Sequence, residues 1–412
     1  MVFRILLKTL KFLLKTVGIF FGILLLIVAF NYLVTERYIF PNPKPFSGSY
    51  WYNPYQDLKE TDWRLTNLHM HSRAWGGITN GSDNNENKIW EVYQNLGYES
   101  IGISNYQSIN KLNSHEPYYI PVYEHGYGLF KNHQLVIGAR KVLWYDLPFG
   151  QNIHHKQYIL NRLHKTADMI SINHPAFFKG YSPEDFKYLT GYELLEVLNG
   201  YRNSFAHWDS ALSAGKPAFL MADDDMHDVS DATEPSRRLM MVNSPDNSRK
   251  NICASLLAGR TIGIEIIMPD SETFGSKSIR LSNLPKIKKF RIAGDTLELE
   301  LNRTAMDIKF YGQNGKQLWS KGRISRAKYI LRPADTYIRT EIIYSSTSNW
   351  NGITYYLNPV VRSADGKKPL MEAAIVDQRS TWTYRIVGFA TVIFILLNIL
   401  YLRKRTRRAS RS

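Results

Sequence analysis

The chain has 412 residues, a formal net charge of +16 and 44% hydrophobic residues, enough for one large domain or two ordinary ones. The positive charge does not indicate nucleic-acid binding, because much of it lies in two short terminal segments beside apolar runs. With Cys253 as its one cysteine, the chain can form neither an internal disulfide nor a CxxC zinc knuckle.

An uncharged run follows the basic N-terminal segment. Residues 1–15 carry only basic charges, and residues 16–35 carry none, a length that spans a bilayer core of about 30 Å as a helix. A cleaved signal peptide is the alternative. The long apolar run and the absence of a small-x-small cleavage site favour an uncleaved membrane anchor. Residues 36–64 are rich in proline, tyrosine and tryptophan, which predicts a linker leaving the membrane.

Residues 65–275 alternate short apolar runs with amphipathic stretches. This alternation is typical of βαβ units, and it predicts an α/β domain built on a parallel sheet. The expected strands are Leu65–Met70, Ser100–Ser104, Leu135–Gly138, Met169–Ile172, Leu194–Val197 and Ala218–Met221, and the expected helices are Glu86–Leu96, Asn161–Thr166 and Trp208–Ala214.

Polar side chains lie at or just after the end of each expected strand. A barrel of parallel strands has its active site at the carboxyl ends of the strands, so this placement predicts an enzyme-like site. In chain order the residues are His69, His71, Asn105, Arg140, His174, Asn199, Asp223, Asp224, Asp225 and His227.

The C-terminal part has a different pattern. Residues 276–376 contain period-two alternation and an Asn314-Gly315 turn between two strand-like runs, which predict a small β-sandwich-like domain beside the barrel. Residues 386–402 form a second uncharged run, and the basic tail 403–412 favours a membrane span over a buried core helix. The positive-inside rule then predicts two cytoplasmic termini and central domains outside a bacterial inner membrane.

Two short motifs, His69-x-His71 and Asp225-x-His227, indicate metal chemistry. In extended chain, positions i and i+2 point to the same face, so each motif directs two ligands at one point. Imidazole and carboxylate ligands suit Zn²⁺, Mn²⁺ or Fe²⁺, and such an ion activates water and polarises a phosphoryl oxygen. Each motif alone also fits surface histidines or a solvated loop, and His154-His155 also fits a helix N-terminus. The joint placement favours a metal site.

The segments 67–72, 97–104, 136–138, 172–175, 195–199 and 225–227 resemble, in order and spacing, the PHP (polymerase and histidinol phosphatase) domain. The resemblance covers about residues 65–265 and implies a distorted (β/α)7 barrel, up to three divalent metals and phosphoester hydrolysis. It implies a catalytic role for Asp225 and His227. By position it implies metal ligation by His69, His71, His174, Asp225, His227 and His155, with His154 as the alternative to His155.

The chain departs from the family pattern at three places. Asn80 stands where an Asp or His is usual, Asn105-Tyr106 where Asp-His is usual, and Ala139-Arg140-Lys141 where a bridging Glu is usual. We therefore expect fewer than three ions. We also expect Asn105 and either Arg140 or Lys141 to bind the substrate phosphate, with Arg140 assisting catalysis in place of a missing metal. The alternative for Arg140 is a surface ion pair with Asp223, Asp224 or Glu196.

Three functions fit these observations. The first is a membrane-anchored, outward-facing metal-dependent phosphoesterase acting on a phosphorylated envelope compound. The second is a barrel that has lost catalysis and binds an anionic ligand or a protein partner. The third is a structural membrane protein that assembles through its β domain. Substrate and oligomeric state are not predicted by the sequence.

Overall fold

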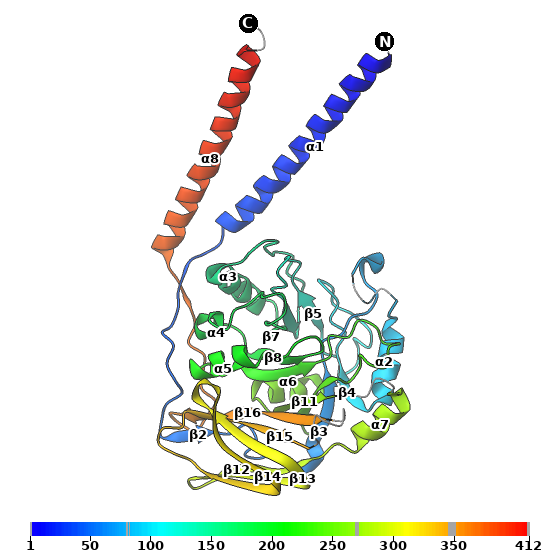
Figure 1. Cartoon of the computed structure of the whole chain (residues 1–412), viewed down its shortest axis with the longest axis vertical. Coiled ribbons are helices and arrows are strands. Elements are labelled where there is room, and N and C mark those ends of the chain that lie inside the picture. Colours follow the sequence, from blue (N-terminus) through cyan, green and yellow to red (C-terminus); the bar gives the residue numbers. More distant parts are fainter. Residues whose placement is uncertain (1, 80, 82, 268–271, 345–351, 410–412) are drawn as a thin grey trace.

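The computed structural model describes residues 2–79, 81, 83–267, 272–344 and 352–409, so Asn80 lies outside the described residues. Two long helices, α1 (Val2–Leu33) and α8 (Gln378–Ala409), leave the same side of a mixed α/β body (Figure 1). Val2–Leu33 and Gln378–Thr406 are long and apolar enough to cross a membrane, and none of their most apolar stretch is buried against the body. The two predicted apolar segments are therefore helices that could serve as membrane spans.

The chain enters and leaves the body side by side. Strand β1 (Tyr38–Ile39) pairs with β17 (Ile375–Val376), next to the bases of the two helices. The Arg37 amide donates to Thr381 Oγ1 at 2.9 Å, and the Tyr384 hydroxyl donates to the Tyr32 carbonyl at 3.2 Å. The segment predicted as a linker thus includes a strand, and its contacts hold α1 and α8 together where they meet the body.

A five-stranded sheet carries much of the predicted barrel, in the order β5-β6-β7-β8-β9. The pairs β5/β6 and β6/β7 are antiparallel, whereas β7/β8 and β8/β9 are parallel. All of these strand residues are buried, as in a sheet covered on both faces. The strands are β5 (Val122–His125), β6 (Gln134–Ile137), β7 (Met169–Ile172), β8 (Leu194–Asn199) and β9 (Phe219–Asp223), accompanied by helices α3 (Ile153–His164), α4 (Asp185–Tyr188) and α5 (Phe205–Ser213).

A ten-stranded sheet contains the remaining long strands. Its order is β12-β13-β15-β16-β11-β10-β3-β4, with β14 paired to β13 and β2 to β16. Its strands are β2 (Tyr50–Tyr52), β3 (Trp63–Asn67), β4 (Tyr98–Ile101), β10 (Arg238–Asn243), β11 (Thr261–Ile266), β12 (Ile287–Ala293), β13 (Thr296–Gly312), β14 (Lys316–Ile330), β15 (Tyr337–Ile343) and β16 (Ile353–Ser363). Three helices connect consecutive strands of this sheet: α2 (Glu86–Asn95), α6 (Arg249–Leu257) and α7 (Phe274–Ser282).

The predicted parallel (β/α)7 barrel with a separate sandwich differs from this arrangement. Strand β6 is antiparallel to both neighbours. The connection 126–133 between β5 and β6 is too short for the crossover that a parallel pair requires, whereas the connection from β6 to β7 is long and contains α3, so its length alone does not set the direction of that pair. Strand β16 pairs with β11, so the C-terminal strands extend a sheet that also contains β3 and β4. The six expected strands are present, whereas β5, β10 and β11 were not predicted.

The two sheets pack closely. A side chain at Gly263 on β11 would come within 2.6 Å of Leu220 Cδ2 on β9 and 2.9 Å of Leu198 Cδ1 on β8. Glycine therefore lets the backbone of one sheet approach the side chains of the other. The predicted hairpin is also present: Phe310 pairs with Trp319 across the β13–β14 turn, where Asn314 and Gly315 both have positive φ.

Candidate metal centre

The segments that follow β3 and β9 run parallel and bring the two sequence motifs together. The His71 amide donates to the Met226 carbonyl at 2.9 Å, and the Asp225 amide donates to the His69 carbonyl at 3.0 Å. The side chains of Met70 and Met226 are fully buried in the apolar core. Because neighbouring side chains in extended chain point to opposite faces, His69 and His71 share the other face, and the side chains of Asp225 and His227 lie against them.

Asp225 lies among three imidazoles. Its Oδ1 atom is 3.2 Å from His69 Nε2, 3.2 Å from His71 Nε2 and 3.4 Å from His227 Nε2. The rings of His71 and His227 stack with their centroids 4.5 Å apart. The side chain of His227 is 13% exposed and that of His69 fully buried, so His227 lies on the open side.

Glu124 on β5 is the centre of the site. Its carboxylate lies 3.3 Å from His69 Nε2 and 3.4 Å from His71 Nε2. It also lies 3.0 Å from His133 Nδ1 and 3.1 Å from His174 Nε2. Two groups with metal-ligand geometry therefore share this carboxylate: His69, His71, Glu124 and Asp225 form the first, and Glu124, His133 and His174 form the second.

The antiparallel pairing of β6 and β7 explains why His133 and His174 are neighbours. His133 precedes β6 and His174 follows β7, so both lie at the same end of the pair, and the Asn173 amide donates to the His133 carbonyl at 3.1 Å. His174 has φ of +26° and Asp225 of +53°. Such conformations cost roughly 1–3 kcal/mol each and cluster at functional sites. Here their amides are held by Glu196 and His69.

Glu196 on β8 orients the ligands. Its Oε1 atom lies 2.8 Å from His69 Nδ1, and its Oε2 atom accepts the His174 amide at 2.7 Å. If His69 is neutral and its proton is on Nδ1, facing Glu196, then the lone pair of Nε2 faces Glu124 and Asp225. Asn199 Nδ2 donates to both Glu196 and Asp225, at 3.1 and 3.2 Å. Carboxylate–histidine pairs of this kind fix the orientation of metal-binding imidazoles.

The electrostatics of the centre favour a cation. In the described part of the chain, the ion-pair partners of Glu124 and Asp225 are all histidines. Burial alone would raise the pKa of both carboxyls, but the adjacent histidines, chiefly His133 and His69 for Glu124 and His69 for Asp225, hold each pKa well below its usual value. Burial lowers the pKa of His69, but Asp225, Glu196 and Glu124 outweigh it and raise the pKa well above its usual value. The cluster thus stabilises positive charge at its middle.

The donor set fits a divalent metal. His69 Nε2 and Glu124 Oε2 are buried and have no hydrogen-bond partner within the described residues. Buried polar atoms without a partner are rare, and a ligated ion would satisfy those that face the middle of the cluster. Nitrogen and carboxylate ligands suit Zn²⁺, Mn²⁺ or Fe²⁺.

A cavity of about 390 Å³ opens beside the centre. His133 and Tyr106 lie in its wall, with Lys131 and several aromatic residues. The Tyr106 ring stacks on His71 with the centroids 4.5 Å apart, and its carbonyl accepts a hydrogen bond from Trp75 Nε1 at 2.8 Å. His133 is the member of the cluster in the wall of this cavity, so a substrate in the cavity would meet the cluster at His133.

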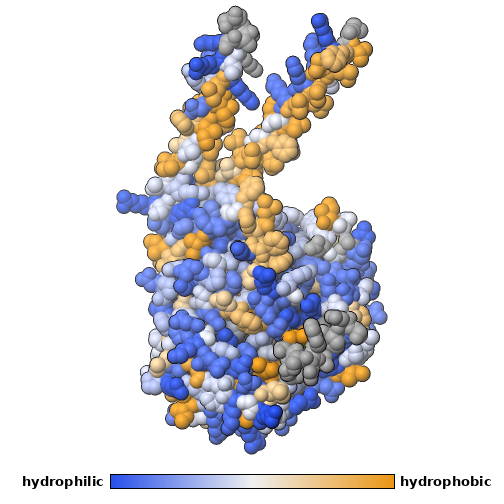
Figure 2. Space-filling model, in the orientation of Figure 1, coloured by the Kyte–Doolittle hydropathy of each residue, from blue (hydrophilic) through white to orange (hydrophobic). Residues whose placement is uncertain are grey.

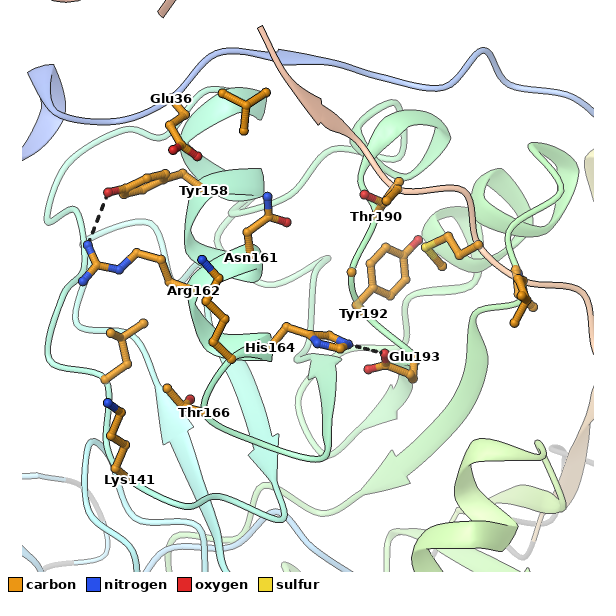
Figure 3. A pocket seen from close by; sticks show the side chains of 18 of the residues that line it. Glu36, Lys141, Tyr158, Asn161, Arg162, His164, Thr166, Thr190, Tyr192 and Glu193 are labelled. Atoms are coloured by element: carbon orange, nitrogen blue, oxygen red, sulfur yellow. Dashed lines mark hydrogen bonds and ion pairs between the residues drawn. The ribbon is translucent and has the colours of Figure 1, made fainter. Parts of the chain in front are cut away.

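Arg140 and Lys141 do not reach this cluster, contrary to the expectation. Both follow β6, whose carboxyl end lies beside the start of β7 because the two strands are antiparallel. Arg140 instead bonds Asp168 Oδ1 at 3.1 Å, with its side chain 55% exposed. Lys141 lines a different cavity, of about 1020 Å³, in which His164 pairs with Glu193 (Figure 3). Arg140 thus forms a surface ion pair, with Asp168 rather than with Asp223, Asp224 or Glu196.

His155 and His154 also lie elsewhere. Asn152 and His155 form a reciprocal capping box at the start of α3, and the His155 ring meets Tyr32 edge-on at 5.1 Å. Burial, with smaller effects of Arg37 and His154, lowers the pKa of His155 to about 4. His154 Nδ1 accepts the Tyr38 amide at 3.0 Å. The helix N-terminus accounts for this pair, and His133 occupies the place in the cluster expected for His155.

Asn105 is close to the centre but is already bonded. Its Oδ1 atom accepts the Ser72 amide at 2.8 Å and its Nδ2 atom donates to Ser72 Oγ at 2.8 Å. It therefore positions the segment after His71, and these bonds use its Oδ1 atom and one of its two amide N–H groups. Glu124 and His133 were not predicted, although Pro121 and Gly126, which flank β5, were a usable signal for a short strand.

Comparisons with known proteins add little. No family model and no curated protein matches the chain. One solved structure is similar over 81% of this chain and 99% of its own, with 13% identity and a TM-score of 0.38. It is a two-domain protein from Bacteroides vulgatus ATCC 8482 that contains a predicted PHP-like metal-dependent phosphoesterase. At that TM-score the likeness carries no functional weight, so function is inferred below from the residues of the site.

Proposed function

We propose that the protein is a metal-dependent phosphoesterase of PHP type that holds one or two divalent ions. The observation that carries this proposal is the position of Glu124, one buried carboxylate shared by two groups of metal ligands. Paired ions a few ångströms apart are a common device for hydrolysing phosphate esters. The motif resemblance described for residues 65–265 points to the same chemistry.

The residues divide the work as follows. Glu124, His69, His71 and Asp225 hold one ion, and Glu124 with His133 and His174 holds the other. When bound, the ions supply an activated water and neutralise phosphate charge. Glu196 and Asn199 hold the ligands in register. Burial, with a smaller effect of His71, lowers the pKa of His227 to about 4, so this imidazole, on the open side beside Asp225, accepts rather than donates a proton at neutral pH.

The geometry does not favour the alternative of a barrel that binds an anion without a metal. That alternative required a cation in place of a bridging carboxylate, whereas Arg140 lies at the opposite end of β6 and Glu124 supplies a carboxylate. Without a bound cation, the buried carboxylates of Glu124, Asp225 and Glu196 would repel a phosphate. The geometry therefore favours the metal enzyme.

The proposal includes membrane anchoring, with both termini in the cytoplasm and the body outside a bacterial inner membrane. Two observations support it: α1 and α8 leave the body on the same side, and both outer flanks are basic (Figure 1). A reporter active only in the cytoplasm should work when fused after Ser412. Activity there of a reporter that works only in the periplasm would contradict the orientation.

Hydrolysis by the full-length protein in detergent tests the enzyme. After reconstitution with Zn²⁺, Mn²⁺ or Fe²⁺, we expect turnover of p-nitrophenyl phosphate or its bis ester. His69→Ala should abolish turnover. The matched control is His164→Ala, which removes a half-exposed histidine paired with Glu193 far from the cluster. Equal turnover by His69→Ala and the control would refute the proposed centre.

A further inference from the structure

Exposed apolar side chains surround the cavity beside the metal centre. Ile78 is 90% exposed, Leu129 68% and Trp144 59%. Together with Trp75, Tyr127 and Phe149 they form what we call the apolar rim. Trp75, Ile78, Tyr127 and Trp144 also line the cavity. Large apolar groups gathered on a surface mark an interaction site, because exposing them to water is unfavourable.

The apolar rim is built from loops that contact one another. The rings of Trp75 and Trp144 meet edge-on at 5.5 Å. The Tyr127 hydroxyl donates to the Asp146 carbonyl at 3.2 Å, and the Leu129 amide donates to the Pro148 carbonyl at 2.9 Å. The rim is therefore one surface.

The rim adjoins the last turn of α1 through the segment 144–149. The Tyr145 hydroxyl donates to the Asn31 carbonyl at 2.5 Å, and the Phe149 amide donates to the Tyr32 hydroxyl at 2.8 Å. Both helix residues belong to the last turn of α1, which ends at Leu33. Figure 2 shows apolar surface continuing from the helix onto the body beneath it. Tryptophan and tyrosine beside the end of a membrane-spanning helix are typical of a membrane–water interface.

We propose that the apolar rim inserts into the bilayer surface and that the substrate is a membrane amphiphile with a phosphate ester. This inference rests on the proposed phosphoesterase. The apolar chain of the substrate stays in the bilayer while its headgroup enters the cavity, where Lys131 faces its negative charge. Hydrolysis joins the water oxygen to phosphorus and breaks the ester P–O bond. The alcohol oxygen takes a proton and remains in the bilayer, and phosphate leaves.

Contact with the bilayer is measured without any turnover. In a Cys253→Ser background, the full-length protein with Leu129→Cys carries an environment-sensitive dye in nanodiscs containing brominated lipid. We expect a blue shift and quenching at position 129. Ile279→Cys, 68% exposed on α7, is the matched control and should show neither. Equal emission at both positions would contradict insertion of the rim into the bilayer, and the rim would then be a contact surface for a soluble partner or a second copy of the chain.

The substrate class is tested with phosphatidic acid in nanodiscs and with soluble p-nitrophenyl phosphate. Leu129→Ser/Phe149→Ser removes two rim residues that do not line the cavity. It should lower phosphatidic acid hydrolysis by more than about tenfold, because the loss of even one buried apolar anchor corresponds to about that factor. Hydrolysis of the soluble ester should not change. Ile279→Ser/Ile330→Ser removes two exposed apolar side chains elsewhere, 68% and 66% exposed, and should alter neither reaction.

The outcomes separate the two proposals. Turnover of the soluble ester alone by the wild type overturns the amphiphile substrate and leaves the phosphoesterase intact. Turnover of neither ester after metal reconstitution refutes the phosphoesterase and, with it, this substrate. Wild-type rates with both esters in the rim variant overturn the role of the rim.

Discussion

The two ends of the five-stranded sheet use the same residue types for opposite purposes. At one end, Glu124 and Asp225 are buried among histidines. At the other end, Asp168 lies 3.1 Å from Arg140 and 2.7 Å from Arg249, with its side chain 38% exposed. An arginine stays charged and satisfies the carboxylate within the protein, whereas a histidine can give up its proton and leave the buried carboxylate to attract an external cation. The choice of partner, more than the carboxylate itself, distinguishes a metal site from a surface ion pair.

Glu124→Gln should reduce hydrolysis more than any other substitution at either end of the sheet. The amide removes the charge shared by the two ligand groups. Loss of a ligand should exceed the roughly 10–100-fold effect of losing a group that only orients a ligand. We expect p-nitrophenyl phosphate hydrolysis to fall by more than about 100-fold on that basis. Asp168→Asn, the same change at the other end, should retain the wild-type rate. Equal losses in the two variants would mean that the ends are not functionally distinct.

Glu196→Gln should have the next largest effect. The amide still occupies the space beside His69 Nδ1 but no longer fixes its proton there. We expect metal affinity to fall by roughly 10–100-fold, with hydrolysis restored by raising the metal concentration. Metal titrations of the variant measure this shift. A loss that excess metal does not rescue would contradict a purely orienting role.

His155→Ala separates folding from metal binding. The substitution removes one half of the capping box, the bond from the Asn152 amide to His155 Nδ1, and the edge-on contact with Tyr32, which together should lower stability by about 1–2 kcal/mol. Thermal unfolding in detergent reports this loss, and metal content should remain at the wild-type value. If metal content fell in proportion to that of His69→Ala, His155 would be a ligand after all.

Arg140→Ala should have the smallest effect. A half-exposed arginine–aspartate pair contributes about 0–1 kcal/mol, so unfolding should shift little. Hydrolysis and its inhibition by phosphate should be unchanged. A tenfold weaker inhibition by phosphate would place Arg140 at the substrate.

The sequence predicted the parts of the site that depend on local geometry. His69-x-His71 and Asp225-x-His227 each direct two side chains to one face, and the structure brings all four together. The direction of β6 was predicted wrongly. Taking β6 as parallel placed Arg140 at the site and left out His133, which precedes the strand. Direction depends on the neighbouring strand, and β5 is only four residues long, so Glu124 stood in no recognised element. His155 was assigned to the site for a different reason: a histidine near a helix N-terminus cannot be told from a metal ligand by sequence alone.

Metal content tests the central claim most directly. Full-length wild-type protein, reconstituted in detergent and freed of excess ion, should hold about one to two equivalents of a transition metal per chain, as expected for two ligand groups sharing one carboxylate. Asp168→Asn should hold the same amount, and Glu124→Gln should hold less than about a tenth of an equivalent. A wild-type protein without bound metal, or a Glu124→Gln variant that retains the full wild-type content, would contradict the account.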